Sequence, residues 1–171
     1  KALRRDAPNA RLMVHPLGPG YDFEEALANG ELDVVIGNWP EPPEHLHTAP
    51  LLEDDVVVLM DRSNPLARSP MTREQYLHAP HVVPLPYSSS HRGVIDKYLA
   101  THRLTRNARI VVPFFSMAPN MLPGTDLIFT ISRHFAEHYA STLPLTVVPC
   151  PIDYPRMRFY QIWHGRNQRS P

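Results

Sequence analysis

The sequence predicts an α/β protein in which helices cover both faces of a mostly parallel sheet. Its 171 residues alternate short apolar runs with segments of helical periodicity, a pattern typical of strands joined by helices. The clearest such unit joins a helix over residues 22–29 to an apolar strand over residues 31–37. Twenty prolines lie between these segments, so we interpret them as turns and element ends.

This helix and strand carry the strongest local signals in the chain. Asp22 and Glu25 predict a capping box at the start of the helix, and Gly30 predicts its end. The following strand is predicted to be buried and parallel. It would deliver Asn38 and Trp39 to the carboxyl edge of the sheet, where small ligands bind in open α/β folds.

The other elements are predicted in chain order from the same signals. Residues 1–7 have the pattern of the last turns of a helix. Strands are expected at residues 11–15, 56–60, 81–85, 109–113, 126–131, 145–148 and 156–163. Helices are expected after the caps at Thr72, residues 88–90 and Ser132, and over residues 116–122.

The composition argues against several functional classes. Seventeen basic residues balance 17 acidic residues, so the chain lacks the positive excess by which most nucleic-acid binders hold phosphates. No apolar run approaches the roughly 18 residues of a membrane span, and no secretory signal pattern is visible. The single cysteine, Cys150, excludes an internal disulfide and suits a reducing compartment. We therefore expect a cytoplasmic protein that makes no membrane contact.

The order of the segments resembles a known family. ALANGELDVVIG (residues 26–37) and PLLEDDVVVLMDRSNPLA (residues 50–67) resemble the effector-binding domain of LysR-type transcriptional regulators. ARIVVPFFSMAPNMLPGTDLIFTISRHFAE (residues 108–137) and FYQIWHGRNQRSP (residues 159–171) are similar to the branch that includes the NahR, DntR and NodD regulators. Many members of that branch respond to aromatic acids, nitroaromatics or flavonoids. The resemblance covers nearly the whole chain.

The resemblance implies an α/β fold of the type 2 periplasmic-binding-protein class, with two Rossmann-like lobes, two crossover strands and an effector in the cleft. Lobe I would comprise residues 1–61 plus 149–171, and lobe II residues 62–148, with crossovers near residues 60–64 and 147–154. The family's N-terminal winged helix-turn-helix domain, the first strand of lobe I and its last helix have no counterpart, so we expect a fragment. The family further implies a homodimer, a tetramer at full length, DNA contact only through the winged helix-turn-helix, and no cofactor.

Four loop tips are expected to converge in the cleft. They are Asn38 and Trp39; Ser88, Ser89, Ser90 and His91; Phe114, Phe115 and Ser116; and Thr130. Their aromatic rings could stack on a ligand ring, and hydroxyl and backbone N–H groups at helix starts could hold a carboxylate or nitro group. The sequence therefore predicts a flat aromatic effector with an anionic or polar substituent. The resemblance supports His91 and the Phe114-Phe115 pair in particular.

Each candidate also has a structural interpretation. Trp39 could cover the loop at residues 40–43, the serine tract could serve only as a helix cap, and His91 could face solvent. In an extended segment the adjacent Phe114 and Phe115 point in opposite directions, so one of them is expected to pack in the core.

The spacing of the reactive residues supports neither a hydrolytic site nor a metal site. Ser90, His91 and Asp96 are the residue types of a hydrolytic triad, but a serine next to its histidine cannot easily point at it. His45 and His47 lack a third ligand at a telling spacing. We expect neither a catalytic nor a metal site, and we interpret the single cysteine as a buried structural thiol.

Two other functional classes remain open at this point. A solute-binding protein of a transport system would have the same fold, and a secretory signal would distinguish it. An enzyme on this fold, such as a prephenate dehydratase, would carry a Thr-Arg-Phe signature that the chain lacks. A basic set is interpreted as a solvated face that could contribute to subunit contacts: Arg156, Arg158, Arg166 and Arg169.

Overall fold

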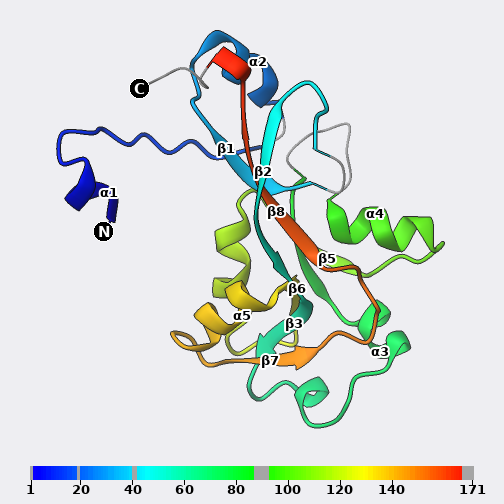
Figure 1. Cartoon of the computed structure of the whole chain (residues 1–171). Helices are drawn as coiled ribbons and strands as arrows, with labels where there is room; N and C mark the ends of the chain where they lie inside the picture. The colour runs from blue at the N-terminus through cyan, green and yellow to red at the C-terminus, as the bar shows by residue number, and fades with distance from the viewer. Residues whose placement is uncertain (1, 19, 40–41, 87–92, 167–171) are drawn as a thin grey trace.

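Two β-sheets divide the protein into an upper and a lower unit (Figure 1). The computed structural model describes residues 2–18, 20–39, 42–86 and 93–166. We call the two parts the three-stranded unit and the five-stranded unit. Helix α1 (Ala2–Asp6) confirms the predicted N-terminal helical turns and lies on an extended segment that runs away from both units (Figure 1).

The three-stranded unit is an antiparallel sheet covered on one face by a helix. Its strand order is β1 (Val35–Asn38), β8 (Met157–Trp163) and β2 (His47–Asp54). Helix α2 (Phe23–Asn29) packs on this sheet and contributes Leu27 to the core between them. The remaining buried members of that core are Val35, Leu46 and Ile162.

The five-stranded unit is a mixed sheet with helices on both faces. Its strand order is β5 (Ala108–Val112), β4 (His81–Pro84), β6 (Ile128–Ser132), β3 (Val56–Asp61) and β7 (Leu145–Pro149). One face is covered by α5 (Arg133–Ala140) and the 3₁₀ helix η2 (Phe115–Met121). The other face is covered by α3 (Arg73–His78), α4 (Val94–Thr101) and the 3₁₀ helix η1 (Pro65–Ala67).

The alternation of side chains along β3 and β6 explains their long apolar runs. Phe129 and Ile131 face α5 and η2, whereas Ile128 faces α3. Val57 and Val58 divide between the two faces in the same way. A strand covered on both faces is expected to be a nearly continuous apolar run, and β6 is buried throughout, with Thr130 and Ser132 as its polar members.

Local capping signals set two helices, although of the capping box predicted at Asp22 and Glu25 only the Asp22 side-chain cap is formed. The Asp22 carboxylate accepts hydrogen bonds of 3.1 and 3.0 Å from two backbone N–H groups of α2. Gly30 ends that helix with φ 83°, a conformation that favours glycine. Thr72 and Gln75 form a reciprocal capping box at the start of α3. These boundaries therefore follow from sequence chemistry alone.

The expectation of a mostly parallel sheet was wrong. In the described part of the chain only the β4–β5 and β4–β6 pairs are parallel, whereas β1, β2, β3, β7 and β8 pair antiparallel. Strand β1 also lies at a sheet edge, beside β8, and is not a central parallel strand. Periodicity indicates how a strand is buried but carries no information about the direction of its partner.

The chain crosses between the units earlier than expected. Strand β3 pairs with β6 and β7, so residues 56–61 belong to the five-stranded sheet and not with residues 1–54. The first crossing therefore lies at Asp54 and Asp55, before residues 60–64. The apolar residues of β3 need neighbours on both sides, whereas charged residues tolerate solvent at a crossing. The second crossing, over residues 150–156, overlaps the expected interval.

Two further differences concern strands. Residues 11–15 form no strand, and Leu12, Met13 and Val14 are exposed. Among the described residues no strand pairs with this segment, and a β-strand needs a neighbouring strand for its ladder of backbone hydrogen bonds. Strand β2 was not predicted, because it contains Pro50 and lacks polar–apolar alternation. Its pairing with β8 forms it.

Candidate functional site

An aromatic ladder joins the two units. Phe115 of η2 contacts Phe129 of β6 at 5.3 Å between ring centroids and Phe135 of α5 at 5.5 Å. Phe135 in turn lies 6.4 Å from Phe159 of β8, in the three-stranded unit. These distances and tilted geometries are typical of favourable ring pairs. Four separate elements thus place a continuous row of aromatic rings where the two sheets approach each other.

Asn38 lies at this same junction. It is paired across the sheet with Phe159, and its amide nitrogen approaches the sulfur of Met157 at 3.9 Å. Met157 packs with Ile95 of α4 in a cluster that also includes Phe159. The structure therefore brings predicted residues Asn38 and Phe115 to one region through β8, although they are distant in sequence.

The adjacent phenylalanines separate as predicted. Phe115 packs in the ladder, whereas Phe114 remains 49% exposed. Ser116, in the first turn of η2, is exposed, and its carbonyl accepts a hydrogen bond from Asn120. Phe114 and Ser116 therefore lie on the surface beside the ladder.

Two other predicted residues point elsewhere. The Trp39 ring packs 5.6 Å from the ring of Phe23 and covers Gly37, where an added Cβ would lie 2.8 Å from the indole. Thr130 is buried on the opposite face of β6 from Phe129, where its hydroxyl is 2.7 Å from that of Tyr76. Both residues therefore have structural partners away from the ladder.

The predicted loop tip formed by Ser88, Ser89, Ser90 and His91 lies outside the described residues. Helix α4 begins after Gly93, which is its N-cap and provides no side-chain hydrogen bond. The predicted cap at residues 88–90 was therefore wrong, because the helix starts three residues further along.

Helix α5 is capped from the other unit. Its predicted cap, Ser132, is 1% exposed, and among the described groups its Oγ finds no hydrogen-bond partner. Instead, the Asp54 carboxylate accepts a hydrogen bond of 2.7 Å from the backbone N–H of His134. The Asp55 carbonyl accepts another, of 2.9 Å, from the N–H of Arg133. The first crossing thus accepts hydrogen bonds from the free N–H groups at the N-terminus of α5, where negative charge is favourable.

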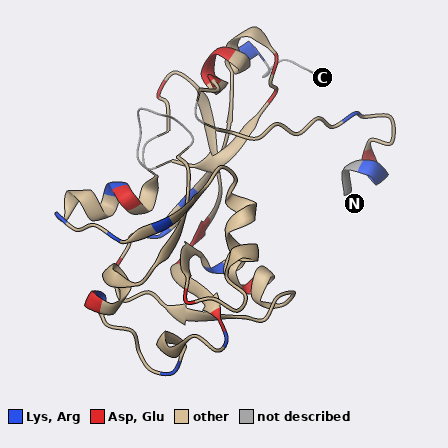
Figure 2. Ribbon diagram, turned by 180° about the vertical axis from the view of Figure 1, so that it is seen from behind, with Lys and Arg blue, Asp and Glu red and all other residues tan. Residues whose placement is uncertain are grey.

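Ion pairs surround the two crossings. Arg158 pairs with Glu53 at 2.6 Å, and Arg156 pairs with Asp55 at 3.2 Å. Arg133 approaches Asp55 at 3.8 Å. Arg156 and Arg158, interpreted from sequence as a solvated face, are exposed. Arg156 links the second crossing to Asp55 of the first, whereas Arg158 pairs with Glu53 across strands β8 and β2. Acidic and basic residues are interspersed along the whole chain (Figure 2).

A polar cluster lies beneath α3 and α4. The Tyr76 hydroxyl contacts those of Thr130 and Tyr154, at 2.7 and 3.0 Å. His81 Nε2 contacts the Tyr76 carbonyl at 2.7 Å, and burial lowers the pKa of His81 to about 4. Burial raises the pKa of Tyr76 to about 12. The pKa of Cys150 is likewise raised by burial, to about 11, which keeps this thiol protonated and unreactive.

The other reactive candidates have structural partners. Asp96 accepts two hydrogen bonds of 2.8 Å from Arg106, so its carboxylate is engaged in an ion pair with a buried guanidinium. His45 pairs with Glu24 at 3.0 Å, and His47 stacks on Trp163. Within the described ranges no three potential ligands gather in a way that could hold a metal ion.

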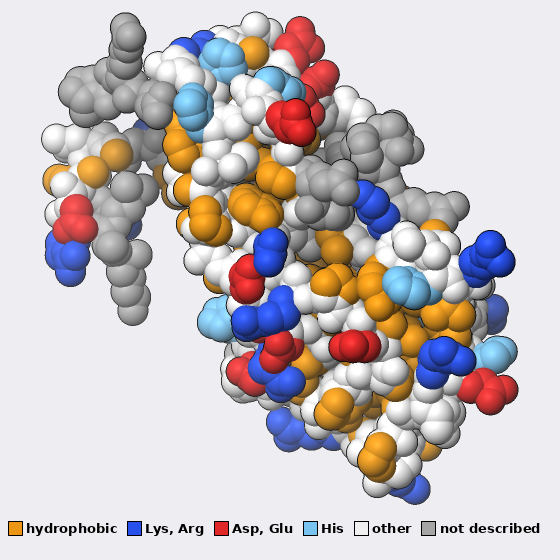
Figure 3. Space-filling view, turned by 45° about the vertical axis from the view of Figure 1, so that its right-hand side comes forward, with side chains coloured by type: hydrophobic (Ala, Val, Ile, Leu, Met, Phe, Trp, Pro, Cys, Tyr) orange, Lys and Arg blue, Asp and Glu red, His pale blue; other side chains and the backbone are white. Residues whose placement is uncertain are grey.

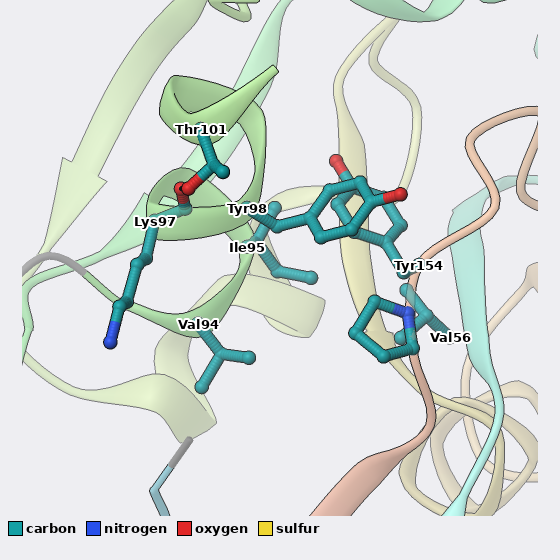
Figure 4. Close-up of a pocket in the computed structure, with 8 residues that line it drawn as sticks. Val56, Val94, Ile95, Lys97, Tyr98, Thr101 and Tyr154 are labelled. Carbon is teal, nitrogen blue, oxygen red and sulfur yellow. The ribbon is translucent and has the colours of Figure 1, made fainter. Parts of the chain in front are cut away.

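Two hollows open beside the crossings. The first, of about 180 Å³, lies between α4 and the segments at Val56 and Tyr154 (Figure 4). The second, of about 340 Å³, lies between the crossings and includes Cys150, Arg133 and Arg156 in its lining. Neither hollow is lined by a predicted site residue.

Sequence reasoning missed Phe135, Phe159 and Asp54. Phe135 was assigned to a helix stripe and Phe159 to the last strand, with no signal that their rings meet. Asp54 stands in an acidic triplet that looks like an ordinary solvated run. No signal in the sequence indicates the capping role of Asp54, because the burial of Ser132 is seen only in the structure.

Comparison with known proteins identifies similar chains. A family model described as LysR substrate binding domain matches residues 1–171. Nodulation protein D 2 of Rhizobium tropici is 34% identical over 169 residues, covering 98% of this chain and 52% of that protein. The HTH-type transcriptional activator NagR of a Ralstonia species is 28% identical over 171 residues, covering 100% of this chain and 56% of that protein. The chain spans about half the length of these curated relatives.

A solved structure confirms the fold. The regulatory domain of MexT, a transcriptional activator in Pseudomonas aeruginosa, superposes with a TM-score of 0.78 at 22% identity. The match covers 99% of this chain and 81% of that domain. The predicted two-unit α/β fold of the type 2 periplasmic-binding-protein class is thereby confirmed. In the described part of the chain, none of the helices is sufficiently long and apolar to span a bilayer.

Proposed function

Because the chain belongs to the LysR substrate-binding domain family, we propose that it senses a planar aromatic effector at the junction of its two units. The aromatic ladder carries this proposal. Phe115 and Phe135 come from one unit and Phe159 from the other. A flat ring that contacts this surface would touch both units at once.

The polar groups beside the ladder favour a ligand with a polar or anionic substituent. Asn38 offers an amide next to Phe159, and Ser116 offers an exposed hydroxyl next to Phe115. Residues 88–91 precede α4, whose Ile95 packs with Met157 at the same junction. We include the residue 88–91 segment, Phe114 and Ser116 in the proposed site, and keep Trp39 and Thr130 as more distant candidates.

Sensing requires that the effector distinguish between two arrangements of the units. A ligand shifts a conformational equilibrium only by the difference between its affinities for the two states. The units, which we take as the two lobes, meet through the Phe135–Phe159 contact and the Asp54–His134 hydrogen bond. An effector bound at the ladder would change these contacts first.

In the whole protein we propose that this change reaches DNA through other parts of the chain. The present chain carries no positive excess, with 17 basic and 17 acidic residues. Sequence-independent DNA affinity comes largely from basic groups that neutralise phosphates. We therefore propose that DNA contact is made by a separate domain and that subunits associate as dimers and tetramers in the complete regulator.

Calorimetric titration of the chain with a panel of aromatic acids tests the proposal. Phe135→Leu and Phe159→Leu should each weaken binding of a positive ligand by about tenfold, which corresponds to about 1.4 kcal/mol. Phe23→Leu is the matched control, because Phe23 packs on Trp39 away from the ladder, and it should change the affinity less than about twofold. Absence of binding across the panel by the folded chain, or equal binding by all variants, would overturn the proposal.

A further inference from the structure

We propose a second small-molecule site, for a single-ring aromatic carboxylate, in the groove between α4 and the two crossings. No ring of the ladder lines it, although Ile95 of its wall packs in one cluster with Phe159. Helices α4 and α5 lie on opposite sides of the crossings (Figure 1). Eight residues line it: Val56, Val94, Ile95, Lys97, Tyr98, Thr101, Tyr154 and Pro155.

The size of the groove suits one ring. Its volume is about 180 Å³, and a closed apolar cavity of roughly 150 Å³ is enough to bind benzene in a protein. Figure 4 shows the Tyr98 and Tyr154 side chains extending between α4 and the crossing segment, with Val94 and Ile95 on the helix side. A molecule with two fused rings and bulky substituents would exceed this space.

The surfaces inside the groove are apolar although two tyrosines form its wall. The Tyr98 hydroxyl donates a hydrogen bond of 2.8 Å to the Asp153 carbonyl. The Tyr154 hydroxyl is 3.0 Å from that of Tyr76. Because both hydroxyls are already engaged, the tyrosines present ring surface to the groove. Their centroids lie 4.9 Å apart at 57°, an arrangement that a third ring can extend by edge-to-face contact.

The rim determines where a charged substituent would lie. Lys97 and Thr101 belong to the exposed side of α4 and line the groove at that edge. A ring carboxylate directed to this rim would stay near a positive charge and remain hydrated, so that it avoids the cost of burial. Figure 3 shows hydrophobic side chains reaching the surface of this face with basic groups beside them.

The groove lies where a bound molecule would contact both crossings between the units. Val56 begins β3 just after the first crossing, and Tyr154 and Pro155 belong to the second. A ring bound here would contact α4 and both crossings together. It would therefore favour the arrangement in which these three segments have their present spacing.

Titration with benzoate, followed by the ring resonances of Tyr98 and Tyr154 in NMR spectra, tests the site. We expect saturable shifts of both rings, and weaker binding by cyclohexanecarboxylate, which has the charge without the aromatic face. Val94→Phe fills the groove and should weaken benzoate binding there by about tenfold. Val111→Phe is the matched control, because Val111 is 55% exposed on β5 and does not line the groove.

A second variant tests the site in case Val94→Phe fails to fold. Thr101→Trp places a large ring at the exposed rim and should block the site with the thermal transition unchanged. Phe135→Leu should leave these shifts intact, so failure here is distinguishable from failure of the ladder site. The proposal is overturned if benzoate shifts neither tyrosine. It is equally overturned if sedimentation shows that a second copy of the chain fills the groove and that Val94→Phe disrupts this dimer.

Discussion

The carboxylate of Asp54, on a strand of the three-stranded unit, accepts a 2.7 Å hydrogen bond from the backbone N–H of His134 in the five-stranded unit. Helix α5 thus receives its cap from the opposite side of the first crossing, and not from Ser132 directly before it. The same carboxylate also accepts a hydrogen bond from the N–H of Asp55. The position of the crossing and the stability of α5 are therefore coupled.

Removal of this cap should destabilise the protein. We expect Asp54→Ala to lower the free energy of unfolding by about 1 to 2 kcal/mol, the usual range for a lost N-cap. Asp54→Asn keeps an acceptor but loses the charge that favours the helix N-terminus, so it should cost less than about 1 kcal/mol. Urea unfolding followed by circular dichroism measures both.

The control for these variants is Asp55→Asn, because the ion pairs of the Asp55 side chain with Arg133 and Arg156 are exposed, and exposed pairs contribute little. Equal stability of Asp54→Ala and the unchanged protein would refute the capping role.

Ser132 should behave in the opposite way to an ordinary cap. Its hydroxyl is buried and, among the described groups, unpartnered, and an unsatisfied buried polar group costs free energy. We expect Ser132→Ala to leave the stability unchanged or to raise it by up to about 1 kcal/mol. Thr72→Ala provides the contrast, because Thr72 Oγ1 accepts a hydrogen bond from Gln75, and its loss should cost about 1 kcal/mol. Thermal unfolding of both variants decides the matter, and a marked loss in Ser132→Ala would contradict this account.

Arg106 and Asp96 should stabilise the folded protein only when both residues are present. The Arg106 side chain is 4% exposed and donates two hydrogen bonds of 2.8 Å to Asp96 in the first turn of α4. Asp96→Ala would leave a buried guanidinium without its counter-charge and should cost about 3 to 5 kcal/mol. The double variant Asp96→Ala with Arg106→Met should recover much of that loss, because no unpaired charge remains.

Urea unfolding of the single and double variants gives the coupling between the two residues. Glu137→Ala, which removes an exposed pair with Arg133 at 3.9 Å, should cost less than about 0.5 kcal/mol. A double variant as unstable as Asp96→Ala alone would show that packing, and not the unpaired charge, accounts for the loss.

His81 should make stability depend on pH in the acid range. Burial lowers its pKa from 6.5 to about 4 in the folded protein, so the unfolded chain binds the proton more readily. Stability is therefore fully present above about pH 6.5 and falls as the pH drops towards 4, by about 3 kcal/mol in all. Arg106, Asp96 and Tyr76 face His81. The pKa of Arg106 is raised by its partner Asp96 against the effect of burial, and burial raises that of Tyr76 to about 12, so neither of these two groups changes its charge in this window.

The measurement is the difference in unfolding free energy between the unchanged protein and His81→Phe from pH 7 to pH 4. The variant should show a flatter pH dependence at a lower overall stability, because it loses the bond to the Tyr76 carbonyl. Exposed His138 provides the control: His138→Gln should keep the original slope. Parallel pH profiles for the protein and His81→Phe would rule out this contribution.

The sequence by itself determined the features that depend on neighbouring residues. Asp22, Gly30, Thr72 and Gln75 set helix ends through hydrogen bonds and dihedral angles within a few residues, and these were predicted. The prediction that only one of Phe114 and Phe115 packs inward was also correct, but its reason, alternation along extended backbone, does not hold, because Phe114 is extended whereas Phe115 already begins the 3₁₀ helix η2.

Only the tertiary structure decided which distant segments meet. Strand β2 exists because β8 pairs with it, and β3 lies in the five-stranded sheet because β6 and β7 enclose it. The Phe135–Phe159 contact and the Asp54 cap each join residues more than 20 positions apart. Periodicity encodes which face of an element is buried but not which partner buries it, so the family and fold were accessible from sequence whereas the junction of the units was not.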